Sequence, residues 1–321
     1  MEQSSETIIL QEFPYGSREN VNTSGVGPEV KIYEVLKDKD IEERVKQIGR
    51  GKREKDFFYY LYAMGGNLKK VNYHEEQYRQ YNEQVEEIMV GKNQPPEGVE
   101  IKEVNNWLYF IINGDCTSND SVGKLYFNLK PSEIVNFLGL VLKKFGEKGL
   151  QAQIKIPREG DSLMFNRRDK VVLYFEPDKA EEVLETLEDL HDTKKFNDGV
   201  PLFAAEVKNK KGEVMRGVGF GEEQITRKRS FGDVRAEILI LLFHIMEEQE
   251  KQGGEIDFKK LFGEVCSRYG VDPENPFLSK PKSGQRLFFE KIKDRLQNQT
   301  GGKKQGQKNF FHSFFRSDKR G

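Results

Sequence analysis

The chain has 321 residues, which is enough for one large domain or two ordinary ones. Its formal net charge of −1 offers no overall field for nucleic acid or a membrane surface, and its 11% aromatic residues exclude a wholly disordered chain. The two cysteines and four histidines show no metal-ligand spacing, so we expect no metal site, no disulfide and a reducing, cytoplasmic compartment. Neither a signal-peptide pattern nor an apolar run of transmembrane length is found, so no membrane span is expected.

Polar residues dominate positions 1–30, which are predicted to form a flexible N-terminal arm. A helical pattern follows over 31–94, and Pro95-Pro96-Glu97-Gly98 marks a boundary after it. Beyond that boundary apolar residues alternate with period two, and Asn105-Asn106 is a good hairpin turn. Strands are predicted at 99–104, 107–112, 124–129, 151–156, 170–175 and 214–220, and helices at 131–145, 178–190, 234–250, 257–269 and 283–296.

Strands and helices alternate irregularly along the chain rather than as strict βα units. We therefore predict an α+β fold, with a mixed, mainly antiparallel sheet and packed helices, preceded and followed by helical segments. Residues 99–298 are expected to form this domain together with its C-terminal helices. Residues 299–321 carry six basic residues interleaved with phenylalanines and are expected to be a disordered tail, the alternative being a contact for RNA, lipid or an acidic peptide.

The strand alternation places a group of polar residues on one face of the predicted sheet. Lys124, Tyr126 and Asn128 lie opposite the apolar positions of their strand, and Lys155 lies opposite the isoleucines of the next strand. A solvated sheet face is the ordinary interpretation of such a pattern. The loop Asn166-Arg167-Arg168-Asp169 leads into the following strand and adds a guanidinium near one end of the same sheet if the strands are neighbours, and this favours a functional site.

Arg235 is a second cationic candidate, near the start of the helix predicted at 234–250. Ser230 or Asp233 would cap that helix, and an arginine is electrostatically unfavourable beside a helix N-terminus. An anion such as phosphate, docked on the free N–H groups, would explain it, whereas an ion pair with Asp233 or Glu237 is the competing interpretation. The glycine run from 217 to 221 lacks the spacing of a nucleotide-binding loop.

Three segments of the chain, in order, resemble the HopA-type effector family. They are Lys124-Leu-Tyr-Phe-Asn-Leu-Lys-Pro131, then Lys155-Ile156 with Arg168-Asp-Lys-Val-Val-Leu-Tyr-Phe175, then Gly219-Phe-Gly-Glu-Glu-Gln224 with Ser230-Phe-Gly-Asp-Val-Arg235. Relatives of that domain are type III secretion effectors and lyase components of lanthipeptide and thioamitide biosynthesis, and they are distantly similar to the phosphothreonine lyases. The resemblance implies a carbon–oxygen lyase that eliminates phosphate from phosphoserine or phosphothreonine and leaves dehydroalanine or dehydrobutyrine.

The resemblance also implies roles for particular residues. A lysine base, Lys155, would remove the Cα proton and Tyr126 would act as the acid, with no metal or organic cofactor. Phosphate binding is implied for Lys124, Arg168 and Arg235, with Asn128 and Asp169 in support. Where phosphothreonine lyases carry a Lys-x-His pair, this chain has Lys124-x-Tyr126, a correspondence that also allows Lys124 to be the base.

Two functions are consistent with this pattern. The first is the lyase, whose partners would be a phosphorylated peptide or protein and a partner kinase. The second is a non-catalytic effector or interaction module that binds a phosphopeptide or a leader peptide at the same basic site. A secreted effector is the alternative to a purely cytoplasmic protein under both interpretations.

Overall fold

The structure, a computed structural model, describes residues 28–68, 71–92, 95–116, 121–224, 229–279 and 292–297. Its strands form one eight-stranded sheet in the order β1-β2-β4-β5-β3-β7-β6-β8, and all neighbouring pairs are antiparallel. The strands are β1 (Val99–Val104), β2 (Trp107–Ile112), β3 (Ser121–Phe127), β4 (Ala152–Pro157), β5 (Val171–Phe175), β6 (Ala205–Lys208), β7 (Val214–Gln224) and β8 (Leu296–Gln297). The predicted α+β class is confirmed.

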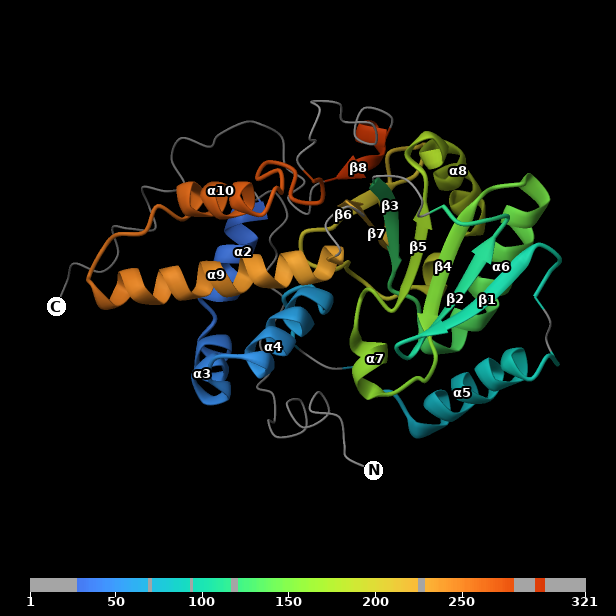
Figure 1. The fold of residues 1–321 in the computed structure, drawn as a ribbon, viewed down its shortest axis with the longest axis horizontal. Helices are drawn as coiled ribbons and strands as arrows, with labels where there is room; N and C mark the ends of the chain where they lie inside the picture. The colour runs from blue at the N-terminus through green and yellow to red at the C-terminus, as the bar shows by residue number, and fades with distance from the viewer. Residues whose placement is uncertain are drawn as a thin grey trace.

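Helices precede, interrupt and follow these strands, as Figure 1 shows. The first group is α2 (Pro28–Leu36), α3 (Lys39–Ile48), α4 (Lys52–Ala63) and α5 (Glu75–Met89). The central group is α6 (Ile134–Lys148), α7 (Ser162–Asn166) and α8 (Ala180–Leu190), and the last group is α9 (Phe231–Lys251) and α10 (Phe258–Arg268). Short 3₁₀ helices lie at Pro131–Glu133, Pro177–Lys179, Thr193–Lys195 and Lys293–Arg295. No helix in the described ranges is long and apolar enough to cross a membrane.

Both faces of the sheet are covered by helices, and each face has its own hydrophobic cluster. Leu125, Phe127 and Ile154 belong to the cluster under α5, α6 and α8. Tyr126 and Val172 belong to the opposite cluster, under α2, α3, α4, α9 and α10, which gather to the left of the sheet in Figure 1. The predicted alternation is therefore confirmed, but the interpretation of a solvated polar face is wrong, because α4 and α9 bury that face.

Local signals explain several element boundaries. Asn105 and Asn106 have φ of 47° and 63°, the left-handed conformation that a two-residue hairpin requires and asparagine tolerates. Ser230 caps α9, its hydroxyl oxygen accepting from the Asp233 N–H at 3.1 Å, and Asp257 caps α10 in the same way. Helix α2 begins at Pro28, within the expected N-terminal arm, and the rest of that arm lies outside the described residues.

Some elements differ from those predicted. Residues 162–166 form α7 instead of a loop, and β3 begins at Ser121, within a predicted loop. The helix predicted at 283–296 ends in a strand, because Leu296 pairs with Val207 at the edge of the sheet; residues 283–291 of it are not described. Arg295 holds that edge by donating to the Lys208 carbonyl at 2.8 Å. An amphipathic pattern cannot reveal such a distant pairing partner.

The glycine run on β7 allows close packing against that strand. Every second residue from Gly217 to Gly221 is glycine, and these positions face the α9 side of the sheet. A Cβ at Gly221 would lie 2.8 Å from the Phe231 ring, and one at Gly219 would lie 2.8 Å from Val200. The run therefore lets α9 and a loop approach the strand closely.

Candidate functional site

The polar residues of the sheet come together on the face beneath α4 and α9. Residues paired directly across neighbouring strands point to the same face. Lys155 on β4 pairs with Val172 on β5, which pairs with Tyr126 on β3. Lys124 lies two residues from Tyr126 on that strand, so β3 and β4 place both lysines on this face, with β5 between them.

Lys155 is partly buried among aromatic rings. Its ammonium lies 4.1 Å from the centroid of Trp107 and 6.0 Å from the centroids of Tyr109 and Tyr174. Burial, followed by repulsion from Lys124, lowers the pKa of Lys155 to about 7. A substantial fraction of this side chain is therefore a neutral amine near neutral pH.

Lys124 is the second cation on this face, and it is deeply buried. Its ammonium forms an ion pair with the Glu223 carboxylate and lies 4.8 Å from the centroid of Tyr174. Glu223 also accepts from the Phe231 backbone N–H at 2.6 Å, at the first residue of α9. The carboxylate thus joins Lys124 to the start of that helix.

Arg167 is the third cation, and the sequence pointed to it only as part of the loop before β5, without assigning it a role. It forms a two-fold hydrogen-bonded ion pair with Asp169, at 2.8 and 3.0 Å, and donates to the Tyr59 hydroxyl at 3.1 Å. Its guanidinium carbon lies 5.4 Å from the centroid of Trp107, the ring that Lys155 also faces. Burial alone would raise the pKa of Asp169, but Arg167 outweighs it and the pKa is lowered.

These side chains form an alternation of cations and rings that we call the cationic row: Lys124, Tyr174, Lys155, Trp107 and Arg167. Each end cation has its own carboxylate partner. Lys155, in the middle, has no carboxylate within ion-pair distance among the described residues. The row therefore concentrates positive charge around one lysine that can lose its proton.

Arg168 points away from the cationic row. Its Nη1 donates to the Val200 carbonyl at 3.2 Å, and its backbone N–H donates to the Ala63 carbonyl at 2.8 Å. A Cβ at Gly65 or at Gly199 would lie 2.2 or 2.5 Å from this guanidinium, so the arginine fits only against glycines. Arg168 ties the end of α4 to the loop around residue 200. Arg167, one residue earlier, is the guanidinium that reaches the row.

Arg235 is likewise engaged elsewhere. It is 2% exposed, donates to the Pro276 carbonyl at 2.8 Å and lies 3.9 Å from the centroid of the Phe231 ring. The competing interpretation of an ion pair does not hold either, because the Glu237 carboxylate pairs with Arg229 at 2.6 Å and the Asp233 carboxylate lies 3.9 Å from the Lys55 ammonium. At the start of α9 the Phe231 N–H donates to the Glu223 carboxylate and the Asp233 N–H donates to the Ser230 hydroxyl.

Tyr126 and Asn128 lie beside the row rather than in it. Tyr126 is buried, its ring centroid is 5.8 Å from that of Phe231, and burial together with nearby Tyr62 raises its pKa well above the ordinary value. Asn128 donates to the Asp198 carbonyl at 2.8 Å and accepts from the Lys170 ammonium. Asn128 therefore holds the loop at Asp198 directly. Through the buried Lys170, which also donates to the Arg167 carbonyl, it is connected to the loop before β5.

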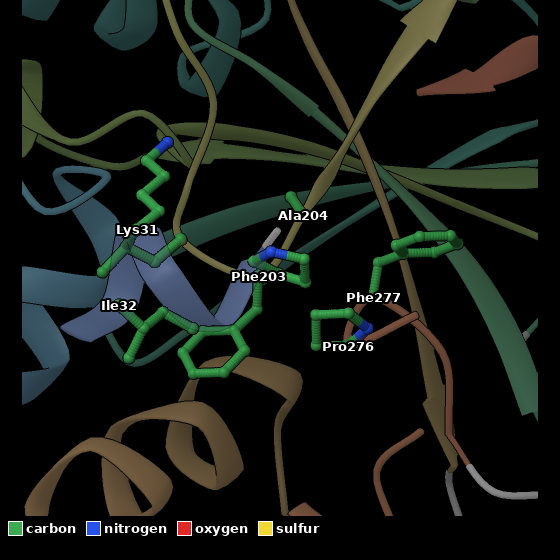
Figure 2. A pocket seen from close by; sticks show the side chains of 8 residues that line it. Lys31, Ile32, Phe203, Ala204, Pro276 and Phe277 are labelled. Atoms are coloured by element: carbon green, nitrogen blue, oxygen red, sulfur yellow. The ribbon is translucent and has the colours of Figure 1, made fainter. Parts of the chain in front are cut away.

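A separate hollow lies between α2 and the segment that follows residue 200, and Figure 2 shows it. Its walls are mostly apolar, contributed by Ile32, Phe203 and Phe277 among others. Lys31 lines it too, and burial lowers the pKa of that lysine to about 8. No cluster of potential metal ligands occurs in the described parts of the chain. The cationic row is therefore the stronger candidate for chemistry.

The chain is similar to known effector proteins in sequence and in fold. The family model described as "HopA1 effector protein family" matches residues 102–278, while no curated protein matches the chain. A solved effector protein from Pseudomonas syringae pv. tomato strain DC3000 is similar at 16% identity and a TM-score of 0.52, covering 79% of this chain and 99% of its own. An effector protein from Pseudomonas syringae pv. syringae strain 61 is similar at 13% identity and a TM-score of 0.53, covering 79% and 98%. At these identities the two structures show a shared fold.

Proposed function

Because the chain belongs to the HopA1 effector protein family, we propose that it acts as an effector on a phosphorylated protein or peptide and eliminates phosphate from phosphoserine or phosphothreonine. The observation that carries this proposal is Lys155, a lysine with a pKa of about 7 set between two other cations on one sheet face. Elimination requires a neutral amine beside a site that attracts a dianion, and the cationic row combines both.

The proposed step is a β-elimination. The Lys155 amine takes the Cα proton of the phosphorylated residue, and the electron pair left on Cα forms the Cα–Cβ double bond. The bond between Cβ and the phosphate oxygen breaks, and the oxygen leaves with its electron pair as phosphate. The products are a dehydroamino acid and inorganic phosphate, and water is not consumed.

The other two cations of the row would bind the departing phosphate. Lys124 supplies an ammonium on β3, separated from the Lys155 strand by β5, and Arg167 supplies a guanidinium beside the ring that Lys155 faces. We assign Arg167 this role in place of Arg168 and Arg235, whose guanidinium groups donate to backbone carbonyls. Tyr126 remains the proposed acid, and its raised pKa makes it a weak proton donor.

A second function, a phosphopeptide-binding module without catalysis, is favoured by a different observation. Lys124 and Arg167 are already paired with the carboxylates of Glu223 and Asp169. A phosphate would have to compete with those carboxylates, and strong charge stabilisation of a leaving group would be reduced accordingly. Binding of a phosphopeptide alone requires less charge stabilisation from the same cations than expulsion of phosphate does.

We propose a target cell as the place of action, with a kinase of that cell supplying the phosphorylated substrate. Cys116 and Cys266 are both buried and are not joined in a disulfide, which suits a reducing compartment. Burial raises the pKa of Cys116 to about 12, so that thiol is a poor nucleophile.

The two functions are separated by a pair of variants at one position. The full chain is incubated with a library of phosphoserine and phosphothreonine peptides, and peptide masses are followed. A lyase removes the mass of phosphoric acid, whereas a phosphatase leaves the hydroxyl in place. Lys155→Arg retains the positive charge but cannot act as a base, so turnover should stop while peptide binding persists. Lys155→Ala should lose turnover and weaken binding.

Three outcomes bear on the proposal. Loss of phosphoric acid that disappears in both variants supports the lyase. Binding without any mass change, retained in Lys155→Arg, supports the binding module instead. Full turnover by Lys155→Arg would refute the assignment of the base, and return of a hydroxyl would refute elimination altogether.

A further inference from the structure

Two lysines of the cationic row face one aromatic ring, and either would be a chemically reasonable base. The Lys124 ammonium lies 4.8 Å from the centroid of Tyr174, and the Lys155 ammonium lies 6.0 Å from the same centroid. Two like charges in so small a volume repel each other, so one lysine gives up its proton more readily than the other. The groups around the two lysines determine which of them loses its proton first.

Glu223 forms an ion pair with one of the two lysines and not with the other. Its carboxylate pairs with Lys124 and also accepts from the Phe231 N–H at 2.6 Å, so it is held at two points. It lies on β7 two residues beyond Gly221, the partner of Lys124 across the sheet, which places it diagonally beside that lysine on the same face. It forms no ion pair with Lys155.

We infer that Glu223 is a positioning residue that holds the Lys124 ammonium in an ion pair and leaves Lys155, which has no such partner, as the lysine that exchanges a proton. The inference rests on the proposed function only in naming Lys155 as the base of a reaction. The ion pair gives Lys124 a carboxylate partner, whereas Lys155 has none within ion-pair distance among the described residues. Glu223 thus makes two otherwise similar lysines unequal.

Charged and titratable groups face Lys155 from several elements. Lys124 on β3 and Arg167 before β5 disfavour its protonated form, whereas Asp169 and Glu223 favour it. Tyr109 and Tyr174 face it with their rings, and burial raises the pKa of both, so they stay neutral in the range where Lys155 titrates. Glu223 acts on Lys124 through a direct ion pair and is the weakest of these influences on Lys155, so replacing it by a neutral residue should act mainly on Lys124.

The test measures the protonation of each lysine directly. Intact protein is labelled with a trace of acetic anhydride over a range of pH, and mass spectrometry follows the peptides that contain Lys124 and Lys155. Only a neutral amine reacts, so the pH midpoint of labelling reports the pKa of each site. In the wild type Lys155 should be labelled with a midpoint near 7, ahead of Lys124.

Glu223→Gln keeps an oxygen that can accept from Phe231 and loses the charge. In this variant the labelling of Lys124 should rise several-fold, so the lead of Lys155 over Lys124 should narrow. Glu222→Gln is the matched control, because that carboxylate accepts from the Ser279 N–H and should leave both profiles unchanged. Glu223→Asp keeps the charge and is a second variant in case the glutamine variant does not fold.

Labelling reads protonation and not turnover, so its result is separate from that of the peptide assay. Earlier labelling of Lys124 than of Lys155 in the wild type would overturn the inference. Profiles that are the same in Glu223→Gln and in the wild type would overturn it as well. If the labelling order holds but no peptide is converted, the proposed lyase fails and the role of Glu223 in the charge of the row remains.

Discussion

Lys170 offers the sharpest test of whether burial lowers the pKa of a lysine in this protein. Its side chain is 1% exposed, and its ammonium donates to Asn128 and, at 2.6 Å, to the Arg167 carbonyl. Burial lowers its pKa from 10.5 to about 7. The perturbation is Lys170→Met, which keeps a long apolar chain and removes the amine.

The magnitude follows from linkage between protonation and folding. Between about pH 7 and about pH 10.5 the unfolded chain holds a proton on this lysine that the folded chain does not, so stability rises with pH over that window. From about pH 7 to about pH 9, Lys170 should raise the free energy of unfolding of the wild type by about 2 kcal/mol. The variant lacks this contribution. The acceptors left without a donor lower its stability by a similar amount at each pH, so the slope carries the test.

The assay is urea unfolding of both proteins at several pH values, followed by far-UV circular dichroism and by the fluorescence of Trp107, the single tryptophan. Lys31, Lys155 and Cys116 titrate in both proteins and cancel in the difference between them. The stability difference should therefore change by about 2 kcal/mol across the range. Parallel curves for the two proteins would refute the reasoning, because they would mean that Lys170 stays charged when buried.

Four further predictions follow from particular contacts. If elimination occurs, its kcat/KM should rise with pH through about 7 as Lys155 loses its proton, and a flat profile would speak against this base. Arg235→Met should lower the free energy of unfolding by about 2–4 kcal/mol in urea titrations without weakening phosphopeptide binding, and a selective loss of binding would contradict the placement of this arginine. Gly221→Ala should lower the free energy of unfolding by about 1–3 kcal/mol, because the added Cβ would clash with the Phe231 ring. An unchanged urea midpoint would mean that the ring moves aside freely. Asn106→Gly should stabilise the hairpin by about 0.5 kcal/mol, since its φ is 63°, and a lower melting temperature would argue against that turn.

The fold was predictable where a local pattern has one physical meaning. Period-two alternation around Tyr126 and Lys155 correctly separated the two faces of the sheet, because side chains on a strand alternate whatever packs against them. The cap of α9, predicted at Ser230 or Asp233, and the turn at Asn105 depend only on neighbouring residues, and the structure has the cap at Ser230 and the turn as predicted. Edge strand β8 was missed because its pairing partner lies far away in the sequence.

The candidate site was predictable only in part, for the same reason. The sequence by itself determined that Lys124 and Lys155 share a sheet face, since alternation and composition settle that. Only the tertiary structure decided that Arg167, and not Arg168, lies against the Trp107 ring that Lys155 faces, because adjacent residues in a loop point in directions set by what surrounds them. It alone decided that the face is covered and that Glu223 pairs with one lysine of the two. Burial and pairing set charge, and both depend on chain segments that meet only after folding.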